Sequence, residues 1–249
     1  DGTLSYLKPS NYKTTFSEKN SGVCVAFNEA AKKATKNFIV LAHDDMYFCP
    51  NWDEVFRKEL ENISSLEDFF LSGTMVQPFE SYLKFDCGKT LEDFDEEKLL
   101  KNVNQLKFED FQGTHWQPSL VPKSTWNKAG GFSEEFSPGL GSDPDFNMKL
   151  WNQGVRIFQC LGKSKVYHFG SVTIRKKKDE IFKKNQGSLA NKIFLLKWGI
   201  SIKTFKKHYL KSYYIHNEDL SNPNKNLYYY LDILKDYISK LYYKIFSSL

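Results

Sequence analysis

The sequence contains no long hydrophobic run and few cysteines. No stretch approaches the roughly 20 apolar residues that a transmembrane helix needs, and the first residues are polar, without the apolar core of a signal peptide. The four cysteines among 249 residues form no CxxC pair, which argues against a zinc knuckle and a disulfide framework. We therefore expect a cytoplasmic protein whose thiols are reduced and mostly buried.

Aromatic side chains are abundant by contrast. The chain has 5 Trp, 14 Tyr and 21 Phe, with 41% hydrophobic and 26% charged residues. Such a composition is typical of a folded globule rather than a disordered chain. The length allows one large domain, or one domain with an appendage.

The net charge of +5 conceals an asymmetry along the chain. Residues 1–169 hold 19 Lys and Arg against 24 Asp and Glu, whereas residues 170–249 hold 16 against 6. A basic segment beside an acidic one indicates an anionic partner, such as a membrane, nucleic acid or a charged substrate. A solvated charged face is the alternative reading.

Helical and strand patterns alternate over the first two thirds of the chain. Helices are expected over 21–36, from 51 onward, over 123–131 and after 143. Short apolar runs without period-2 alternation are typical of strands buried on both faces of a parallel sheet. Alternation of this kind predicts an α/β fold, a mainly parallel sheet flanked by helices. The expected strands are 38–42, 69–71 with 74–76, 119–121, 155–159 and 165–169.

Beyond Gly170 the pattern changes to a basic run and then to helical periodicity. We place a domain boundary near residue 172, with residues 1–172 as the α/β domain and residues 173–249 as a basic, aromatic helical extension. Apolar residues recur every three or four positions over Leu227–Leu249, which predicts an amphipathic helix of about six turns.

His43, Asp44 and Asp45 follow the apolar run 38–42 directly. Ligands of open α/β sheets bind at the carboxyl ends of strands. Two carboxylates beside an imidazole suit Mg²⁺ or Mn²⁺ shared with the phosphates of a ligand. An acidic pair on an ordinary surface loop is the alternative.

Two further elements carry candidate chemistry. Asp143 and Asp145 follow a glycine-containing loop and precede a helix, where one acid is expected to cap the helix and the other is available as a general base. His168 lies on the expected strand 165–169, either as a metal ligand or as an ordinary core or edge residue.

Together these motifs resemble the family 2 glycosyltransferases of the GT-A fold, over about residues 1–172. The resemblance depends on the order and spacing of the motifs: Asn28, the strand end Leu41–Asp45, Gly130-Gly131-Phe132 followed by Glu134-Glu135, Asp143-x-Asp145, and His168. It implies a GT-A-like nucleotide-binding sheet, which the helical extension follows in the sequence.

The resemblance also implies roles for single residues. Asp45 is the preferred metal ligand, with His43 and His168 beside it. Asp143 is the catalytic base. Asp1, Asn28 and Asp44 are expected to contact the donor, although the choice between Asp44 and Asp45 as the metal-binding acid stays open. Residues 1–3 resemble the end of the family's second strand, which implies that the preceding strand and helix are absent and the base pocket incomplete.

The implied activity is inverting, metal-dependent transfer of a sugar, in the manner of a hexosyltransferase, from a nucleotide-sugar donor to an acceptor hydroxyl, with Mn²⁺ or Mg²⁺. The expected acceptor is a glycan or a lipid-linked molecule. An anionic membrane is the expected partner of the extension, with location on the inner face of a membrane, and a homodimer is the alternative. We do not expect nucleic acid. Another metal-dependent nucleotide enzyme, such as a nucleotidyltransferase, and a non-catalytic scaffold are the rival functions.

Overall fold

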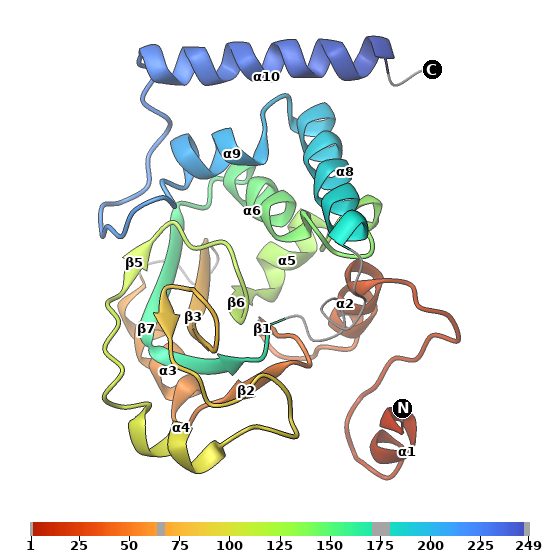
Figure 1. Ribbon diagram of the computed structural model, residues 1–249, viewed down its shortest axis with the longest axis vertical. Coiled ribbons are helices and arrows are strands. Elements are labelled where there is room, and N and C mark those ends of the chain that lie inside the picture. The colour runs from red at the N-terminus through yellow and green to blue at the C-terminus, as the bar shows by residue number, and fades with distance from the viewer. Residues whose placement is uncertain (1, 64–67, 171–179, 247–249) are drawn as a thin grey trace.

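The computed structural model describes residues 2–63, 68–170 and 180–246. Its centre is one seven-stranded sheet in the order β1-β6-β3-β7-β2, with β4 paired to β3 and β5 paired to β7 (Figure 1). The strands are β1 (Phe38–Leu41), β2 (Met46–Phe48), β3 (Phe69–Gln77), β4 (Leu83–Lys84), β5 (Phe111–Gln112), β6 (Ser119–Pro122) and β7 (Ile157–His168).

The sheet is mixed, so the expectation of a mainly parallel sheet is wrong. Only β3 with β7 and β3 with β4 pair in parallel, and the other four pairings are antiparallel. The strands β1, β3 and β7 run in one direction, as crossover connections require. The short strands β2, β5 and β6 run against their neighbours. Short apolar runs carry no signal for direction, which is why the sequence pattern missed this.

Helices cover the sheet on its flanks. The α/β part carries α1 (Thr3–Leu7), α2 (Val23–Lys32), α3 (Trp52–Asn62), α4 (Glu96–Asn102), α5 (Lys123–Ala129) and α6 (Ser142–Asn152), with the short 3₁₀ turn η1 (Glu134–Phe136). The C-terminal part carries α8 (Glu180–Trp198), α9 (Ile202–Thr204), the π turn η2 (Phe205–Tyr209) and α10 (Leu227–Phe246). Figure 1 shows α5, α6, α8 and α9 gathered together, and α10 lying across their outer end.

The largest hydrophobic core joins the sheet to the C-terminal helices. Phe146 and Trp151 of α6 belong to the same cluster as Phe194 of α8 and Phe205 of η2. Of two smaller cores, one lies under α3 and includes Phe56, and the other lies under α4 and includes Leu99. The domain boundary predicted near residue 172 lies outside the described residues, and segments on both sides of it contribute to one core.

Most expected elements are present. Residues 155–159 and 165–169, predicted as two strands, are one long strand, β7, whose pairing with β3 changes register between Gly73 and Thr74. Asn51 precedes α3 as expected but makes no side-chain capping bond. All four cysteines are free and buried, as predicted.

No helix within the described ranges is long and apolar enough to cross a membrane.

Candidate functional site

Polar side chains gather at one edge of the sheet. The strands β1, β3 and β7 run in the same direction and end at Leu41, Gln77 and His168. Residues that directly follow these strands therefore lie at the same edge of the sheet, where the carboxyl ends of the three strands meet. The turn that holds Asp44 and Asp45 leads from β1 into β2, whose first residue pairs with His168. We call this edge the carboxyl-edge site.

Asp45 and His168 form its first polar group. Asp45 Oδ2 lies 3.3 Å from His168 Nε2, and both side chains are mostly buried. The backbone carbonyl of Asp45 accepts a hydrogen bond of 3.0 Å from the amide of Phe169, which fixes the turn against the end of β7. The sequence-predicted pair of ligands is therefore brought together by β7.

Gln77 is the hydrogen-bond partner of His168 Nδ1. Its Nε2 lies 2.7 Å from His168 Nδ1. When this amide donates, Nδ1 accepts and the neutral ring carries its proton on Nε2, facing Asp45. If the Gln77 amide is turned by 180°, its carbonyl accepts from Nδ1–H, and Nε2 becomes a lone-pair donor toward Asp45. The second arrangement is the usual one for a metal-bound histidine.

Asp143 is the centre of the second polar group. It lies in the first turn of α6 and is half-buried. Gln117 Nε2 donates a 3.0 Å hydrogen bond to its Oδ1. Burial raises the pKa of Asp143, while the positive charge that His43 can carry and the Gln117 bond act in the opposite direction. His43 itself packs edge-on against Phe27, with ring centroids 5.6 Å apart.

Asp145, two residues further along α6, has a different role. It is fully buried and accepts from Ser133 Oγ at 2.6 Å and from Trp198 Nε1 at 2.8 Å. Lys197 Nζ lies 3.0 Å from Oδ1, the oxygen that also accepts from Trp198, so Asp145 ties α6 to α8. Neither acid makes a capping bond at the start of α6, so the expectation that one of them caps this helix is wrong. Asp145 is saturated by structural partners, and Asp143 is not.

The remaining residues predicted to contact a donor are placed as follows. The Asn28 side chain makes two hydrogen bonds with the backbone of Phe132. Its Nδ2 donates to the carbonyl at 3.0 Å, and its Oδ1 accepts from the amide at 2.9 Å. Its amide also donates to Glu134 Oε1 at 3.2 Å. Asp44 is exposed in the turn before β2. Asp1 lies outside the described residues. Asn28 thus holds the Gly130–Phe132 loop in place.

The sequence analysis missed Gln77 and Gln117. Gln77 is the last residue of β3, and Gln117 precedes β6, next to a cis Gln117–Pro118 bond. The Oε1 of Gln117 is buried without a partner, an orphaned acceptor beside Asp143. Gln77 ends a strand that was predicted, so its place at the edge was readable. Gln117 lies at this edge because β6 runs antiparallel to β1 and β3, and that direction was not readable. Their uncharged side chains gave no signal of chemistry.

The donor set fits a divalent cation held by few protein ligands. Within residues 2–63, 68–170 and 180–246, no group of three or more His, Cys, Asp or Glu side chains is close enough to enclose a metal. Asp45 and His168 nevertheless suit one cation, because two ligands with bonds of about 2.1 Å are spaced about 3.0–3.4 Å when they share it. Their separation of 3.3 Å falls in that range. His43 is not part of this pair.

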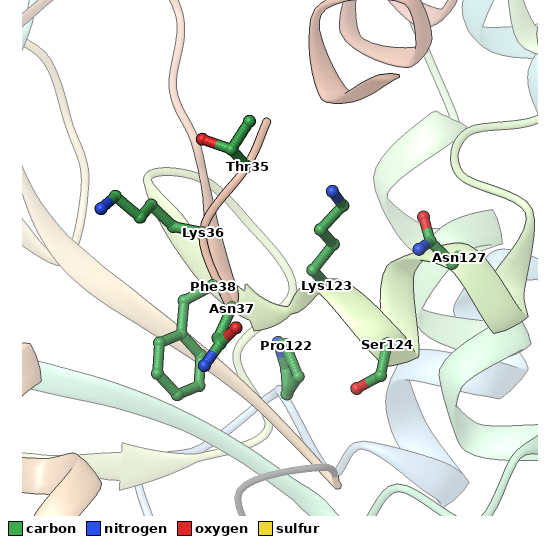
Figure 2. Close-up of a pocket in the computed structure, with 8 residues that line it drawn as sticks. All are labelled: Thr35, Lys36, Asn37, Phe38, Pro122, Lys123, Ser124 and Asn127. Carbon is green, nitrogen blue, oxygen red and sulfur yellow. The ribbon is translucent and has the colours of Figure 1, made fainter. Parts of the chain in front are cut away.

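An open cavity of about 470 Å³ lies elsewhere on the molecule. It is lined by residues at the start of β1 and the end of β6, among them Lys36, Phe38 and Lys123 (Figure 2). Lys123 Nζ donates to the carbonyl of Ala34. This cavity is at the opposite end of β1 from His43 and Asp45, so it is separate from the carboxyl-edge site.

Neither the models of known protein families nor the sequences of characterised proteins give a match to this chain.

Proposed function

We propose that the chain is an inverting glycosyltransferase with a GT-A-like catalytic part, moving a sugar from a nucleotide-sugar donor to an acceptor hydroxyl. The observation that carries the proposal is the contrast between Asp143 and Asp145 on one turn of α6. Asp145 is saturated by Ser133, Trp198 and Lys197. Asp143 accepts a bond from Gln117, is close enough to His43 to be influenced by its charge, and has a pKa raised by burial. The common direction of β1, β3 and β7, with their ends at this site, supports the GT-A-like assignment.

Asp143 is the general base of this reaction. A carboxylate whose pKa is raised by burial takes a proton more readily than an ordinary one, and a positioned base contributes about 10²–10⁴-fold in rate. Gln117 holds one oxygen of the Asp143 carboxylate and leaves the other to receive the acceptor proton. As that proton moves to Asp143, the acceptor oxygen bonds to the anomeric carbon. The bond from that carbon to the diphosphate oxygen breaks, and the nucleoside diphosphate leaves with the electron pair.

Asp45 and His168 are the residues that would hold Mn²⁺ or Mg²⁺ beside the donor diphosphate. The chemistry such a cation supplies is neutralisation of the charge that develops on the leaving diphosphate. Gln77 orients His168 for this task through its ring Nδ1. Asp44, exposed in the same turn, would contact the donor or its hydrated cation.

A glycan or a lipid-linked hydroxyl is the acceptor class that this proposal includes. A nucleotidyltransferase would use the same Asp45 and His168 at another phosphate. In that reaction Asp143 would have no acceptor hydroxyl that attacks an anomeric carbon. The scaffold reading gives none of these residues a ligand. Products therefore separate the three functions: free nucleoside diphosphate with a new glycoside, nucleotide transferred to an acceptor, or no turnover.

The test is the turnover of Asp143→Asn. The parent is first screened for release of nucleoside diphosphate from a panel of nucleotide sugars with manganese and simple glycoside acceptors. With the donor that is found, we expect the variant to lose about 10²–10⁴-fold in kcat while its donor affinity, measured by titration, stays within about twofold.

The matched control is Asp53→Asn, the same change in the exposed first turn of α3, which should keep parental turnover. A variant at Asp143 that transfers sugar at the parental rate removes the base assignment. A parent that transfers nucleotide instead of sugar, or binds none of the donors, replaces the proposed reaction with one of its rivals.

A further inference from the structure

The helix α10 is attached to the protein by its two acids and by Ile233, which packs against the largest core. Asp232 Oδ2 lies 2.6 Å from Lys207 Nζ and 2.9 Å from His208 Nε2. Asp236 is buried, and its Oδ2 accepts a 2.8 Å hydrogen bond from the backbone amide of Ser201. Both acids of this helix are therefore turned toward η2 and the loop before α9, and they are paired there.

The apolar side of α10 faces away from the protein. A stripe of aliphatic residues follows the helix with alternating spacings of four and three, which places them on one face. Each is at least 40% exposed, and Leu227 reaches 70%. A surface helix normally packs this face on the core, so the orientation of α10 is inverted. The stripe consists of Leu227, Leu231, Leu234, Ile238, Leu241 and Ile245.

Tyrosines and lysines border this stripe. Tyr230 and Tyr237 lie on one margin, and Tyr228 and Tyr242 on the other, all more than half exposed. Lysines 235 and 244 lie near the margins as well. Lys235 is 76% exposed, and its ammonium lies 3.9 Å from Asp232 Oδ1. No acid of α10 lies on the outward half, because Asp232 and Asp236 face inward. The outward surface is thus apolar at its centre, aromatic at its margins and positive in charge.

This chemistry matches an anionic lipid surface better than a second copy of the helix. Tyrosine rings favour the boundary between headgroups and acyl chains, and lysines beside an apolar face bind anionic headgroups. A self-pairing helix usually carries opposite charges beside its apolar seam, whereas α10 offers only lysines and tyrosines there. The excess of 16 basic over 6 acidic residues in 170–249 adds long-range attraction to an anionic bilayer.

The position of α10 suits such contact. It lies across the outer end of the molecule, beyond α8 and α9, and in Figure 1 no other element lies outside it. The helix is about 30 Å long, since 20 residues rise about 1.5 Å each. Its full apolar stripe can therefore rest on a flat surface while Asp232 and Asp236 keep it joined to the protein.

We propose that α10 is a peripheral membrane anchor, which lies flat in the headgroup region of an anionic bilayer with its aliphatic stripe inserted and its acids bound to the protein. This inference does not depend on the reaction at the carboxyl-edge site. A protein so anchored acts at the bilayer surface, where a lipid-linked acceptor is available.

Co-sedimentation of the whole chain with vesicles tests the anchor. The vesicles are phosphatidylcholine alone, or phosphatidylcholine with phosphatidylglycerol, each at low and at physiological salt. We expect sedimentation with the anionic vesicles, weakened severalfold by salt because exposed charges are screened within about 8–10 Å. The double variant Leu234→Asp with Ile238→Asp should lower the partition coefficient at least tenfold, since it places two acids in the centre of the stripe.

The matched control introduces the same two charges on another face, as Leu91→Asp with Leu100→Asp. Both leucines are exposed and lie in or before α4. This control should bind vesicles as the parent does, apart from a small effect of net charge. An equal loss in both variants would mean that net charge alone governs binding, and the anchor assignment would be wrong.

Light scattering after size-exclusion chromatography completes the test. A parent that is dimeric, that becomes monomeric in Leu234→Asp with Ile238→Asp, and that fails to sediment with anionic vesicles has a dimer interface at α10 rather than an anchor. A monomeric parent that sediments only with anionic vesicles supports the proposal.

Discussion

The sheet region and α10 use apolar and charged side chains in opposite ways. In the sheet region, Phe69, Leu71 and Val76 of β3 are fully buried, and the residues of the carboxyl-edge site lie where strands end. In α10 the acids are turned inward and the aliphatic stripe outward. The first arrangement builds a site within the protein. The second leaves an apolar surface for something outside it.

In both regions a carboxylate joins one helix to a neighbouring element. Asp145 joins α6 to α8 through Lys197 and Trp198, and Asp232 joins α10 to Lys207 and His208. Each acid is held by a cation and a second donor. The difference lies in burial, because Asp145 is fully buried whereas Asp232 is 17% exposed. Buried pairs are costly to break and surface pairs are not, so the two regions should respond differently to the loss of one carboxylate.

The largest effect is expected for Asp145→Ala. It leaves the Trp198 indole N–H and the Ser133 hydroxyl without their buried acceptor, whereas Lys197 keeps its ion pair with Glu135. Each buried donor left unpaired in this way costs about 1–3 kcal/mol of unfolding free energy, and the two together lower Tm by on the order of 10 °C in a chain of this size. Denaturant unfolding followed by circular dichroism measures it.

Asp143→Ala is the matched control for that change, because it lies on the same turn of α6. It should cost less than about 1 kcal/mol, since within the described part of the chain Asp143 accepts one side-chain bond, from Gln117, and burial of its charge is unfavourable. Equal costs for the two variants would show that Asp143 is a structural residue as well.

The next effect concerns the carboxyl-edge site. Asp45→Asn keeps the volume of the side chain and the backbone bond to Phe169, so the fold should be retained. We expect manganese-dependent binding of the nucleoside diphosphate to weaken at least about 100-fold, because second-shell changes alone cost about 10–100-fold. Calorimetric titration gives the constants. Asp44→Asn is the control: if it loses binding and Asp45→Asn does not, the ligand is Asp44.

A smaller effect is expected where α10 joins the protein. Asp232→Asn removes the ion pairs to Lys207 and His208, and a hydrogen bond between charged groups at this exposure contributes about 1 kcal/mol. Amides of α10 should exchange with solvent about fivefold faster, with those of β3 unchanged. Uniform acceleration in both elements would mean that α10 is part of the global unfolding unit.

Acid pH provides an independent check on Asp232. Hydrogen bonds from Lys207 and His208 lower the pKa of Asp232 to about 2. The stabilisation is therefore complete above about pH 4 and is lost as the pH falls toward 2. The difference in exchange between the parent and Asp232→Asn should disappear over that interval.

The smallest effect is a gain in stability. Because burial raises the pKa of Asp143, the folded protein holds that proton more firmly than the unfolded chain, and ionisation destabilises the folded state as pH rises. Asp143→Asn has no such charge. Its Tm should equal that of the parent near pH 4 and exceed it slightly at pH 8. A difference that shrinks with rising pH would contradict the burial of this carboxylate.

The positions of most strands and helices could be predicted from the sequence, because local apolar patterns determine them. The run Phe38–Leu41 became β1, and the periodicity from Leu227 onward became α10. Strand direction could not be predicted, since the placement of β6 between β1 and β3 depends on pairing between residues some 50 to 80 positions apart. Periodicity likewise gives two faces for α10 but does not say which of them contacts the protein.

The candidate site shows the same division. Asp45 and His168 could be singled out because charge at a strand end is a local signal, and the fold brings them within 3.3 Å of each other. The separate roles of Asp143 and Asp145 were not readable, because Asp145 is bound by Lys197 and Trp198 from a helix distant in sequence. Gln77 and Gln117 belong to the candidate site because the fold places them beside His168 and Asp143, with which they form hydrogen bonds.

The most direct test of the carboxyl-edge site is a thermal-shift measurement on the parent chain. UDP, GDP, ADP, CDP and dTDP are each added with and without Mn²⁺. A ligand present at about 100 times its Kd stabilises the folded state by about 2.7 kcal/mol, or roughly 5–10 °C in a chain of this size. We expect at least one nucleotide to raise Tm to this extent only when Mn²⁺ is present. No shift with any nucleotide and Mn²⁺ together would contradict the assignment of a metal-dependent nucleotide site to Asp45, His168 and Asp143.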